Sequence, residues 1–374
     1  MTPPPARAGD PIEAIATPAL VIDLDALERN IARMAAFARE YGLRLRPHAK
    51  THKSAQIARL QLAAGAVGVC VQKVSEAEAL AAQGIADLYI SNEVIAEDRV
   101  ARVAALAGRV RLAIAVDSAL GIDRLARAVQ AAGSTIDVFV EVDVGQGRCG
   151  VAPAGAGSLA RRVVSHAGLR FAGLQAYHGG AQHIRSSTER EAAIRRAVAA
   201  AAAARAAVTS AGIACPLVTG AGSGSFAFES ASGVHGELQP GSYIFLDCDY
   251  AANEAAPNAP AFEHALFVLC RVMSRGASHA VVDAGHKSHA IDSGPPAVWR
   301  RDLDYANGGD EHGILLARGG NVDALPALDE IVWLVPGHCD PTVNLHDHYV
   351  CLRGGLDQGV VEAVWPVDAR GCVS

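Results

Sequence analysis

Short β-branched segments alternate with alanine-, arginine- and glutamate-rich segments from about residue 19 to residue 245 of this chain. The spacing of the apolar residues predicts that each short segment is a strand and each long one a helix. The first expected pair is a strand over residues 19–23 and a helix over residues 25–41, with Asp25 as its N-cap. About eight such pairs follow one another. This number favours an α/β fold with a (β/α)8 barrel of the TIM type over the alternative, a doubly wound parallel sheet.

The sequence changes character after about residue 245, where glycine, proline and aspartate turns separate short apolar segments. These segments are typical of strands, and no long amphipathic helix is visible between them. We therefore expect a second, mainly β domain, with residues 251–260 as a linker. In this division the barrel spans residues 24–250, and the β domain combines residues 1–23 with residues 251–374. Its predicted strands lie at residues 262–273, 280–283, 331–335, 348–352 and 359–364.

Composition excludes several other kinds of protein. Hydrophobic residues make up 51% of the 374 residues and charged residues 19%, so the chain can bury a large core and is not disordered. The net charge of −6, without a basic run, argues against a nucleic-acid partner. No signal-peptide pattern and no apolar stretch of about 20 residues is visible, which argues against a membrane protein. We expect a cytoplasmic protein whose eight scattered cysteines are free thiols.

Lysine is scarce: the chain has four lysines among its 33 basic residues. Two of them, Lys50 and Lys53, lie in the segment RPHAKTHK at the end of the second predicted strand. Barrel enzymes carry their chemistry at the carboxyl ends of their strands, where a partly buried lysine can form a Schiff base. From the residues alone, a reactive lysine and a solvated basic loop explain this segment equally well.

A glycine- and serine-rich loop at residues 219–225 follows the last predicted barrel strands. Successive backbone N–H groups in such a loop can hold a phosphate, and barrels often bind phosphate at this place. Gly241, Ser242 and Tyr243 form a turn that can close the same site. An ordinary flexible turn remains the alternative for both segments.

The segment GHCD carries a candidate metal-binding pair, His338 and Asp340. In an extended segment residues i and i+2 share a face, so both side chains can bind one cation while Cys339 points away. A histidine and a carboxylate suit Mn²⁺, Mg²⁺ or Zn²⁺ in an open site. The spacing alone slightly favours the alternative, a polar turn.

Two loops at other predicted strand ends carry further candidates. The segment QAYHGGAQH offers His178 and His183 as acid–base groups, and the segment EVDVGQGRCG carries Arg148. The alternatives are loop histidines that make structural hydrogen bonds and an ordinary surface arginine.

A family resemblance runs from about residue 10 to residue 371, and seven motifs carry it: RPHAKTHK, CVQKVSEAEA, EVDVGQGRCGV, GLQAYHG, ELQPGSY, DEHG and VPGHCDPTVNLHD. Together they resemble the fold-type III pyridoxal-phosphate enzymes, which have an alanine racemase-like N-terminal barrel. Within that group the chain is similar to the branch of D-threonine aldolases, 3-hydroxyaspartate aldolases and D-serine dehydratases. The resemblance implies pyridoxal 5′-phosphate, a divalent metal beside it, a small-molecule substrate and a homodimer.

By this resemblance, Lys50 is the Schiff-base lysine, and His338 and Asp340 bind the metal, with Mn²⁺ favoured over Mg²⁺, Zn²⁺ and Co²⁺. Dehydratases of this branch typically have cysteine in place of Asp340, so this residue favours an aldolase. His183 is preferred to His178 as the base that takes the proton of the substrate's hydroxyl. The residues expected around the cofactor, besides Lys50, are Arg148, Gln175, Tyr177, Thr219, Gly222, Ser223, Gly224, Ser225, Gly241, Ser242 and Tyr243.

The implied reaction is the retro-aldol cleavage of a D-3-hydroxy-amino acid of the D-threonine type into glycine and an aldehyde. Cleavage of 3-hydroxyaspartate is one alternative. Dehydration of D-serine or of another 3-hydroxy-amino acid is a second, in which the metal expels the hydroxyl after the Cα proton is lost. A protein that only binds the cofactor is a further alternative. The small single-barrel proteins of that kind lack the second domain and the metal pair, which argues against this alternative.

Overall fold

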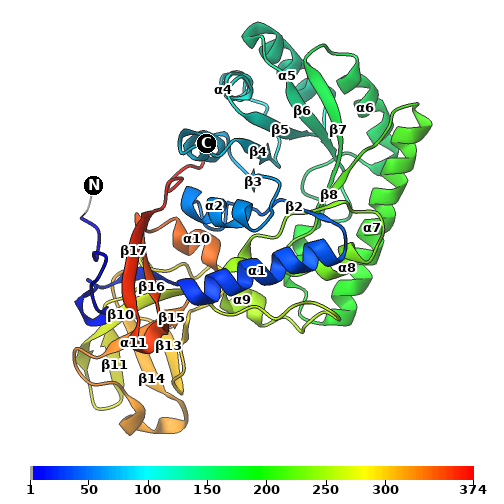
Figure 1. Ribbon diagram of the computed structural model, residues 1–374. Helices are drawn as coiled ribbons and strands as arrows, with labels where there is room; N and C mark the ends of the chain where they lie inside the picture. The colour runs from blue at the N-terminus through cyan, green and yellow to red at the C-terminus, as the bar shows by residue number, and fades with distance from the viewer. Residues whose placement is uncertain (1–2) are drawn as a thin grey trace.

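The computed structural model describes residues 3–374, which form two sheets of eight and nine strands (Figure 1). The first sheet is surrounded by helices, and the second consists mainly of antiparallel strands. Within the described residues no helix is both long and apolar enough to cross a membrane. All eight cysteines are free, as expected.

The eight-stranded sheet is parallel and runs in the order β2-β9-β8-β7-β6-β5-β4-β3. Its two edges meet, because Val67 N donates to Leu45 O at 2.9 Å and Ala49 N donates to Cys70 O at 2.7 Å. These bonds close the sheet, which confirms the (β/α)8 barrel and excludes the doubly wound sheet. The strands are β2 (Arg44–Leu45), β3 (Val69–Val71), β4 (Asp87–Ile90), β5 (Arg111–Val116), β6 (Ile136–Glu141), β7 (Leu169–Ala176), β8 (Val218–Gly220) and β9 (Glu237–Leu238).

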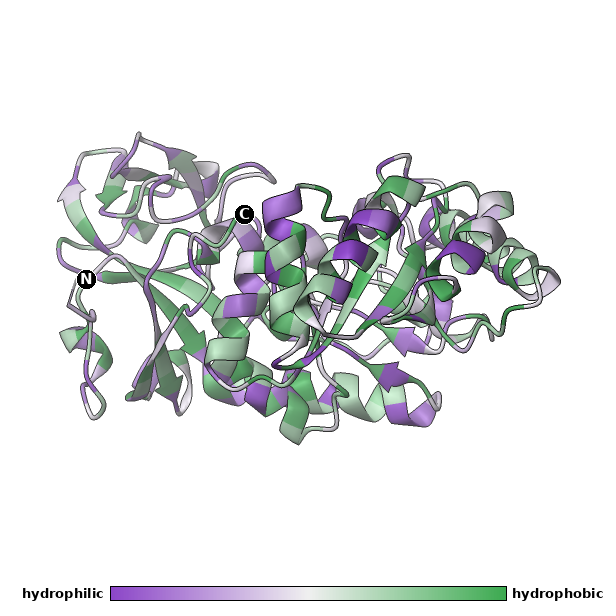
Figure 2. Cartoon of the chain, turned by 90° about the horizontal axis from the view of Figure 1, so that it is seen from above, coloured by the Kyte–Doolittle hydropathy of each residue, from purple (hydrophilic) through white to green (hydrophobic). Residues whose placement is uncertain are grey.

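Helices lie on the outside of the barrel, and each of the strands β2 to β8 leads into one of them (Figure 1). Figure 2 shows the expected division, with hydrophobic residues on the strands and hydrophilic ones on the outer helical faces. Because all eight strands are parallel, their carboxyl ends open on one face of the barrel. The helices are α1 (Leu24–Glu40), α2 (Ala55–Ala63), α3 (Val74–Ala82), α4 (Glu97–Ala107), α5 (Ala119–Ala132), α6 (Ala156–Val164), α7 (Ser187–Ser210), α8 (Phe226–Ser230) and α9 (Cys248–Ala251).

Strand β1 (Ala19–Asp23), expected as the first of the alternating strands, is not a barrel strand. It pairs antiparallel with β10 and parallel with β16 in the second sheet. The eighth barrel strand is instead β9, whose two residues are too few to show a periodic pattern. The expected N-cap of α1 is also wrong: Asp23, not Asp25, accepts a hydrogen bond from Ala26 N at 3.1 Å. Asp23 has the extended backbone that a cap requires, whereas Asp25 lies in the first turn and pairs with Arg353.

The second sheet runs in the order β13-β14-β11-β10-β1-β16-β17, with β15 paired to β10 and β12. It confirms a second, mainly β region, in which α10 (Cys339–Val343) and α11 (Gly355–Gln358) are short. The five strands predicted there are present, and three more were not predicted: β12, β13 and β14. The strands are β10 (Leu266–Arg275), β11 (His279–Val282), β12 (Ala297–Val298), β13 (Leu303–Asn307), β14 (Gly313–Ala317), β15 (Ile331–Val335), β16 (His348–Arg353) and β17 (Val360–Pro366).

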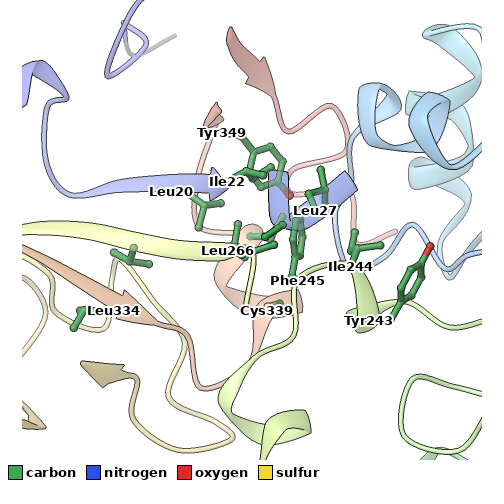
Figure 3. Packing of buried hydrophobic residues seen from close by; sticks show 14 of the residues in the cluster. Leu20, Ile22, Leu27, Tyr243, Ile244, Phe245, Leu266, Leu334, Cys339 and Tyr349 are labelled. Atoms are coloured by element: carbon green, nitrogen blue, oxygen red, sulfur yellow. The ribbon is translucent and has the colours of Figure 1, made fainter. Parts of the chain in front are cut away.

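One buried apolar cluster joins the barrel to the second sheet (Figure 3). It combines Leu27 of α1, Phe245 from the loop after β9, Leu266 of β10 and Tyr349 of β16. Burying side chains of this size stabilises the contact by about 1.5–3 kcal/mol each. The packing therefore holds the segments around residues 245 and 340 in a fixed place beside the barrel mouth.

Candidate active site

A cavity of about 420 Å³ lies at the carboxyl ends of the barrel strands. This volume suits a small molecule or a cofactor. Eight of the residues expected around the cofactor line it: Lys50, Arg148, Gln175, Tyr177, Gly222, Ser223, Gly241 and Ser242. The lining also contains His48, Gln72, Lys73, Ser91, Asn92, Cys149, Gln239 and Tyr250.

The other four expected residues are not part of this lining, and they hydrogen-bond to neighbouring side chains instead. Two of them donate from a hydroxyl: Thr219 Oγ1 to Glu237 and Ser225 Oγ to Glu229, both at 2.9 Å. Gly224 N donates to Gln182 Oε1 at 2.9 Å. Tyr243 OH accepts a hydrogen bond from Gln61 at 3.1 Å.

The glycines of the loop at residues 219–225 leave room for a close backbone approach. A Cβ atom on Gly222 would lie 2.3 Å from Gln182 Oε1, and one on Gly224 would lie 2.6 Å from the backbone oxygen of Gln182. A Cβ atom on Gly241 would lie 2.5 Å from Thr51 Oγ1. Ser223 Oγ accepts a hydrogen bond from Tyr243 N at 2.9 Å, which joins the two segments. Gly222, Ser223, Gly241 and Ser242 all line the cavity, so the two segments form one wall against which a phosphate group would lie.

Lys50 lies in the turn after β2, and its amine hydrogen-bonds to Asp340 Oδ2, across the boundary between the barrel and the second sheet. Burial opposes the charge of Lys50, but the carboxylate outweighs burial and raises the pKa of this lysine. Burial would raise the pKa of Asp340, but the charges of Lys50 and His338 outweigh it and lower that pKa. The candidate cofactor lysine and the candidate metal ligand are therefore direct neighbours.

His338 and Asp340 converge, with His338 Nε2 4.0 Å from Asp340 Oδ2. Asp340 Oδ1 is buried without a hydrogen-bond partner, so it is free to bind a cation. His338 Nδ1 bonds to Asp247 Oδ2 at 2.7 Å, an arrangement that directs Nε2 toward a metal. Between residues 3 and 374, no three His, Cys, Asp or Glu side chains form a metal cluster. A histidine and a carboxylate suit an open divalent site, in which water or substrate would take the other positions.

The route to this convergence differs from the extended segment expected from the sequence. His338 alone is extended, with φ −139° and ψ 133°, and it is the N-cap of α10. Asp340 lies in the first turn of that helix, and Cys339 is buried within the apolar cluster. The chain turns at His338 because Asp247 Oδ2 accepts from Cys339 N at 2.9 Å and thereby fixes the start of the helix.

The two candidate bases have different surroundings. His178 Nδ1 accepts a hydrogen bond from Ala181 N at 3.2 Å, and burial lowers the pKa of this histidine. His183 is 48% exposed, and its Nδ1 lies 2.6 Å from Asp249 Oδ2. Neither histidine lines the cavity, but the ring of Tyr250, which does, lies 5.7 Å from the ring of His183. His183 is therefore the histidine that stands beside the cavity wall.

Two further groups set the charge of the cavity. The guanidinium of Arg148 lies 5.7 Å from the centre of the Tyr177 ring. Burial, and then the charge of Glu93, raises the pKa of Glu141 to about 9. Arg148 lines the cavity and offers a positive charge to an anionic ligand.

Sequence reasoning missed the segment LDCDY, which contains Asp247, Asp249 and Tyr250. Asp247 contacts His338, Asp249 contacts His183, and Tyr250 lines the cavity. The one signal in the sequence was the spacing of two aspartates by a single residue. That spacing matches no general motif, so only the structure reveals the role of this segment.

A (β/α)8 barrel with a lysine and a glycine cradle at its mouth, joined to a mainly β region, defines the class of fold-type III pyridoxal-phosphate enzymes. Comparison with protein families agrees with this class. The alanine racemase N-terminal domain matches residues 22–249, and a putative serine dehydratase domain matches residues 265–352. The chain therefore belongs to the alanine racemase N-terminal domain family, which confirms the resemblance seen in its motifs.

Two of the similar proteins are named aldolases. D-threonine aldolase of Arthrobacter sp. is 47% identical over 373 residues, which are 99% of this chain and 96% of the relative. 3-Hydroxy-D-aspartate aldolase of Paracoccus denitrificans is 43% identical, over 98% of this chain and 95% of the relative. The crystal structure of D-threonine aldolase from Filomicrobium marinum superposes with a TM-score of 0.96 at 50% identity and covers 99% of this chain and 100% of that one.

Proposed function

We propose that this protein is a pyridoxal-phosphate- and divalent-metal-dependent aldolase that cleaves D-3-hydroxy-amino acids of the D-threonine type into glycine and an aldehyde. The contact between Lys50 and Asp340 supports this proposal, because the residue proposed to hold the cofactor lies beside a residue proposed to bind the metal. The names of the two curated relatives support the same reaction class.

The residues at the barrel mouth fit both groups. Lys50 Nζ would hold the cofactor covalently, the segments around Ser223 and Ser242 would hold its phosphate, and His338 and Asp340 would hold the metal. When bound, the cofactor accepts the electron pair released at Cα, and the metal acts as a Lewis acid toward the β-hydroxyl.

The remaining chemistry needs a base and an enclosed site. We assign the base to His183, whose Nε2 takes the proton of the β-hydroxyl. The O–H electron pair then forms the C=O bond of the aldehyde as the Cα–Cβ bond breaks, and Cα takes up a proton to give glycine. Tyr250 and Tyr177 line the cavity in which this chemistry would take place.

Several finer features belong to the same proposal. We propose Mn²⁺ as the metal, on the family resemblance and the His–carboxylate pair. We also propose a cytoplasmic homodimer. We place the barrel domain at residues 24–250 and the β domain at residues 1–23 with 251–374. The pairing of β1 with β10 and β16 supports this division.

Product analysis tests the proposal. Purified protein, loaded with pyridoxal phosphate and Mn²⁺, is incubated with D-threonine, D-phenylserine, D-serine and 3-hydroxy-D-aspartate in separate reactions. We expect glycine and acetaldehyde in equal amounts from D-threonine, and glycine with benzaldehyde from D-phenylserine. Formation of 2-oxobutyrate and ammonia instead would assign a dehydratase. Turnover of 3-hydroxy-D-aspartate alone would assign the narrower aldolase.

A further inference from the structure

Helix α9 and its N-cap place two carboxylates against the two histidines of the proposed reaction. Asp247 Oδ2 lies 2.7 Å from His338 Nδ1, and Asp249 Oδ2 lies 2.6 Å from His183 Nδ1. The ring of Tyr250 lies between these histidines, 5.7 Å from the ring of His183 and 6.3 Å from that of His338. One short element thus contacts both the candidate base and the candidate metal ligand.

Asp249 is held rigidly in place. Its side chain is only 5% exposed, and its Oδ1 accepts a hydrogen bond from Arg185 Nη2. Arg185 Nη1 donates to the backbone oxygen of Asp249 and, at 2.7 Å, to Asn253 Oδ1. Two oxygens of Asp249 are thereby fixed by one guanidinium, which leaves Oδ2 directed at His183.

The contact determines which nitrogen of His183 carries a proton. Burial would raise the pKa of Asp249, but its hydrogen bonds and charge interactions with Arg185 and His183 lower it. Asp249 is therefore an ionised carboxylate that can only accept, so His183 Nδ1 must donate. The other nitrogen, Nε2, then has a free lone pair in the neutral ring.

We propose that Asp249 is a positioning residue, which holds His183 in the tautomer whose Nε2 accepts the proton of the substrate's β-hydroxyl. Asp247 acts in parallel on His338, whose Nε2 it directs toward the metal. The short segment from Asp247 to Tyr250 therefore aligns base and metal ligand with one another. This inference rests on the proposed aldolase function and adds the residue that prepares its base.

The Asp249→Asn variant tests the inference by its kinetics. Asparagine keeps the shape but can donate its amide N–H to Nδ1, which favours the Nε2-protonated ring. We expect kcat for D-threonine to fall about 10²–10⁴-fold, with KM and the cofactor's absorption little changed. A Glu254→Gln variant is the matched control. Glu254 lies in the same region and accepts a hydrogen bond from Ser187 N. We expect the Glu254→Gln variant to retain the activity of the unchanged protein.

The pH profile separates positioning from a loss of packing. Two titratable groups contact His183 directly, namely the carboxylate of Asp249 and the ring of Tyr250. A third charged group, Arg185, contacts the carboxylate of Asp249. Removing the carboxylate removes its favourable charge interaction with His183, so we expect the acidic limb of kcat in Asp249→Asn to move to lower pH. Asp249→Glu, which keeps the charge, is expected to recover part of the activity. A limb that stays in place would count against the inference.

A spectroscopic measurement makes the inference independent of activity. In ¹⁵N-histidine NMR, with His183→Gln used to assign the signal, we expect protonation at Nδ1 in the unchanged protein and at Nε2 in Asp249→Asn. Asp247→Asn should leave this signal unchanged and weaken Mn²⁺ binding about 10–100-fold. An Nε2-protonated His183 in the unchanged protein, or the same tautomer in both proteins, would overturn the inference. A tautomer change without any cleavage of D-threonine would instead overturn the proposed function and leave the positioning role standing.

Discussion

Replacing Lys50 with alanine is expected to abolish covalent attachment of the cofactor and to lower kcat/KM for D-threonine by at least about 10³-fold. The reason lies in the position of this residue. Lys50 is the one lysine that both lines the cavity and contacts the metal-binding pair. Lys73 also lines the cavity, but no contact joins it to His338 or Asp340 in the described residues.

Borohydride reduction followed by peptide mass spectrometry measures the attachment directly. The unchanged protein should carry the reduced cofactor on Lys50, and Lys50→Ala should carry none and should lack the visible absorption band. Lys287→Ala is the control, because Lys287 is 62% exposed in the second sheet region and pairs only with surface carboxylates. A cofactor adduct on Lys73 in either protein would contradict the assignment.

Removing the metal is expected to cause the second large effect. Chelation, His338→Ala and Asp340→Asn should each lower the cleavage rate about 10³-fold, because a Lewis acid stabilises the developing charge by several kcal/mol. The cofactor should stay bound in all three cases, since its expected contacts lie in the barrel. The electron paramagnetic resonance signal of free Mn²⁺ during a titration reports the loss of the site.

Re-addition of Mn²⁺ gives the control within the same experiment. It should restore the cleavage activity of the chelated protein, but not that of His338→Ala or Asp340→Asn. His312→Ala serves as a matched substitution, because His312 is exposed in the second sheet region and has no place in the proposed site. Full activity after chelation, or Mn²⁺ binding that is unchanged in His338→Ala, would remove the metal from the reaction.

The barrel was predictable because its pattern is long and repeated. Strands such as β5 and β6, with six residues each, show clear apolar runs, and each is followed by a helix with apolar residues at helical spacing. The candidate site followed from the same pattern, since the carboxyl ends of parallel strands meet on one face. Lys50 and Ser223 are far apart in sequence but line one cavity for this reason.

The features that sequence reasoning missed depend on contacts between distant segments. Nothing in residues 19–23 shows that β1 pairs with β10, and the two residues of β9 are too few for any periodicity. Lys53 lies in the same motif as Lys50. It does not line the cavity, and its Nζ pairs with Glu76 at 2.9 Å. The spacing of Asp247 and Asp249 matches no general motif, and the role of Asp249 appears only when β7 and β9 bring their loops together.

D-Threonine deuterated at Cα shows which bond breaks first. Retro-aldol cleavage breaks Cα–Cβ and leaves the bond from Cα to its hydrogen isotope intact. We therefore expect that glycine collected early in the reaction, in ordinary water, retains one deuterium at Cα. Loss of that deuterium from the first product formed, accompanied by 2-oxobutyrate, would show that Cα is deprotonated first and would contradict the aldolase assignment.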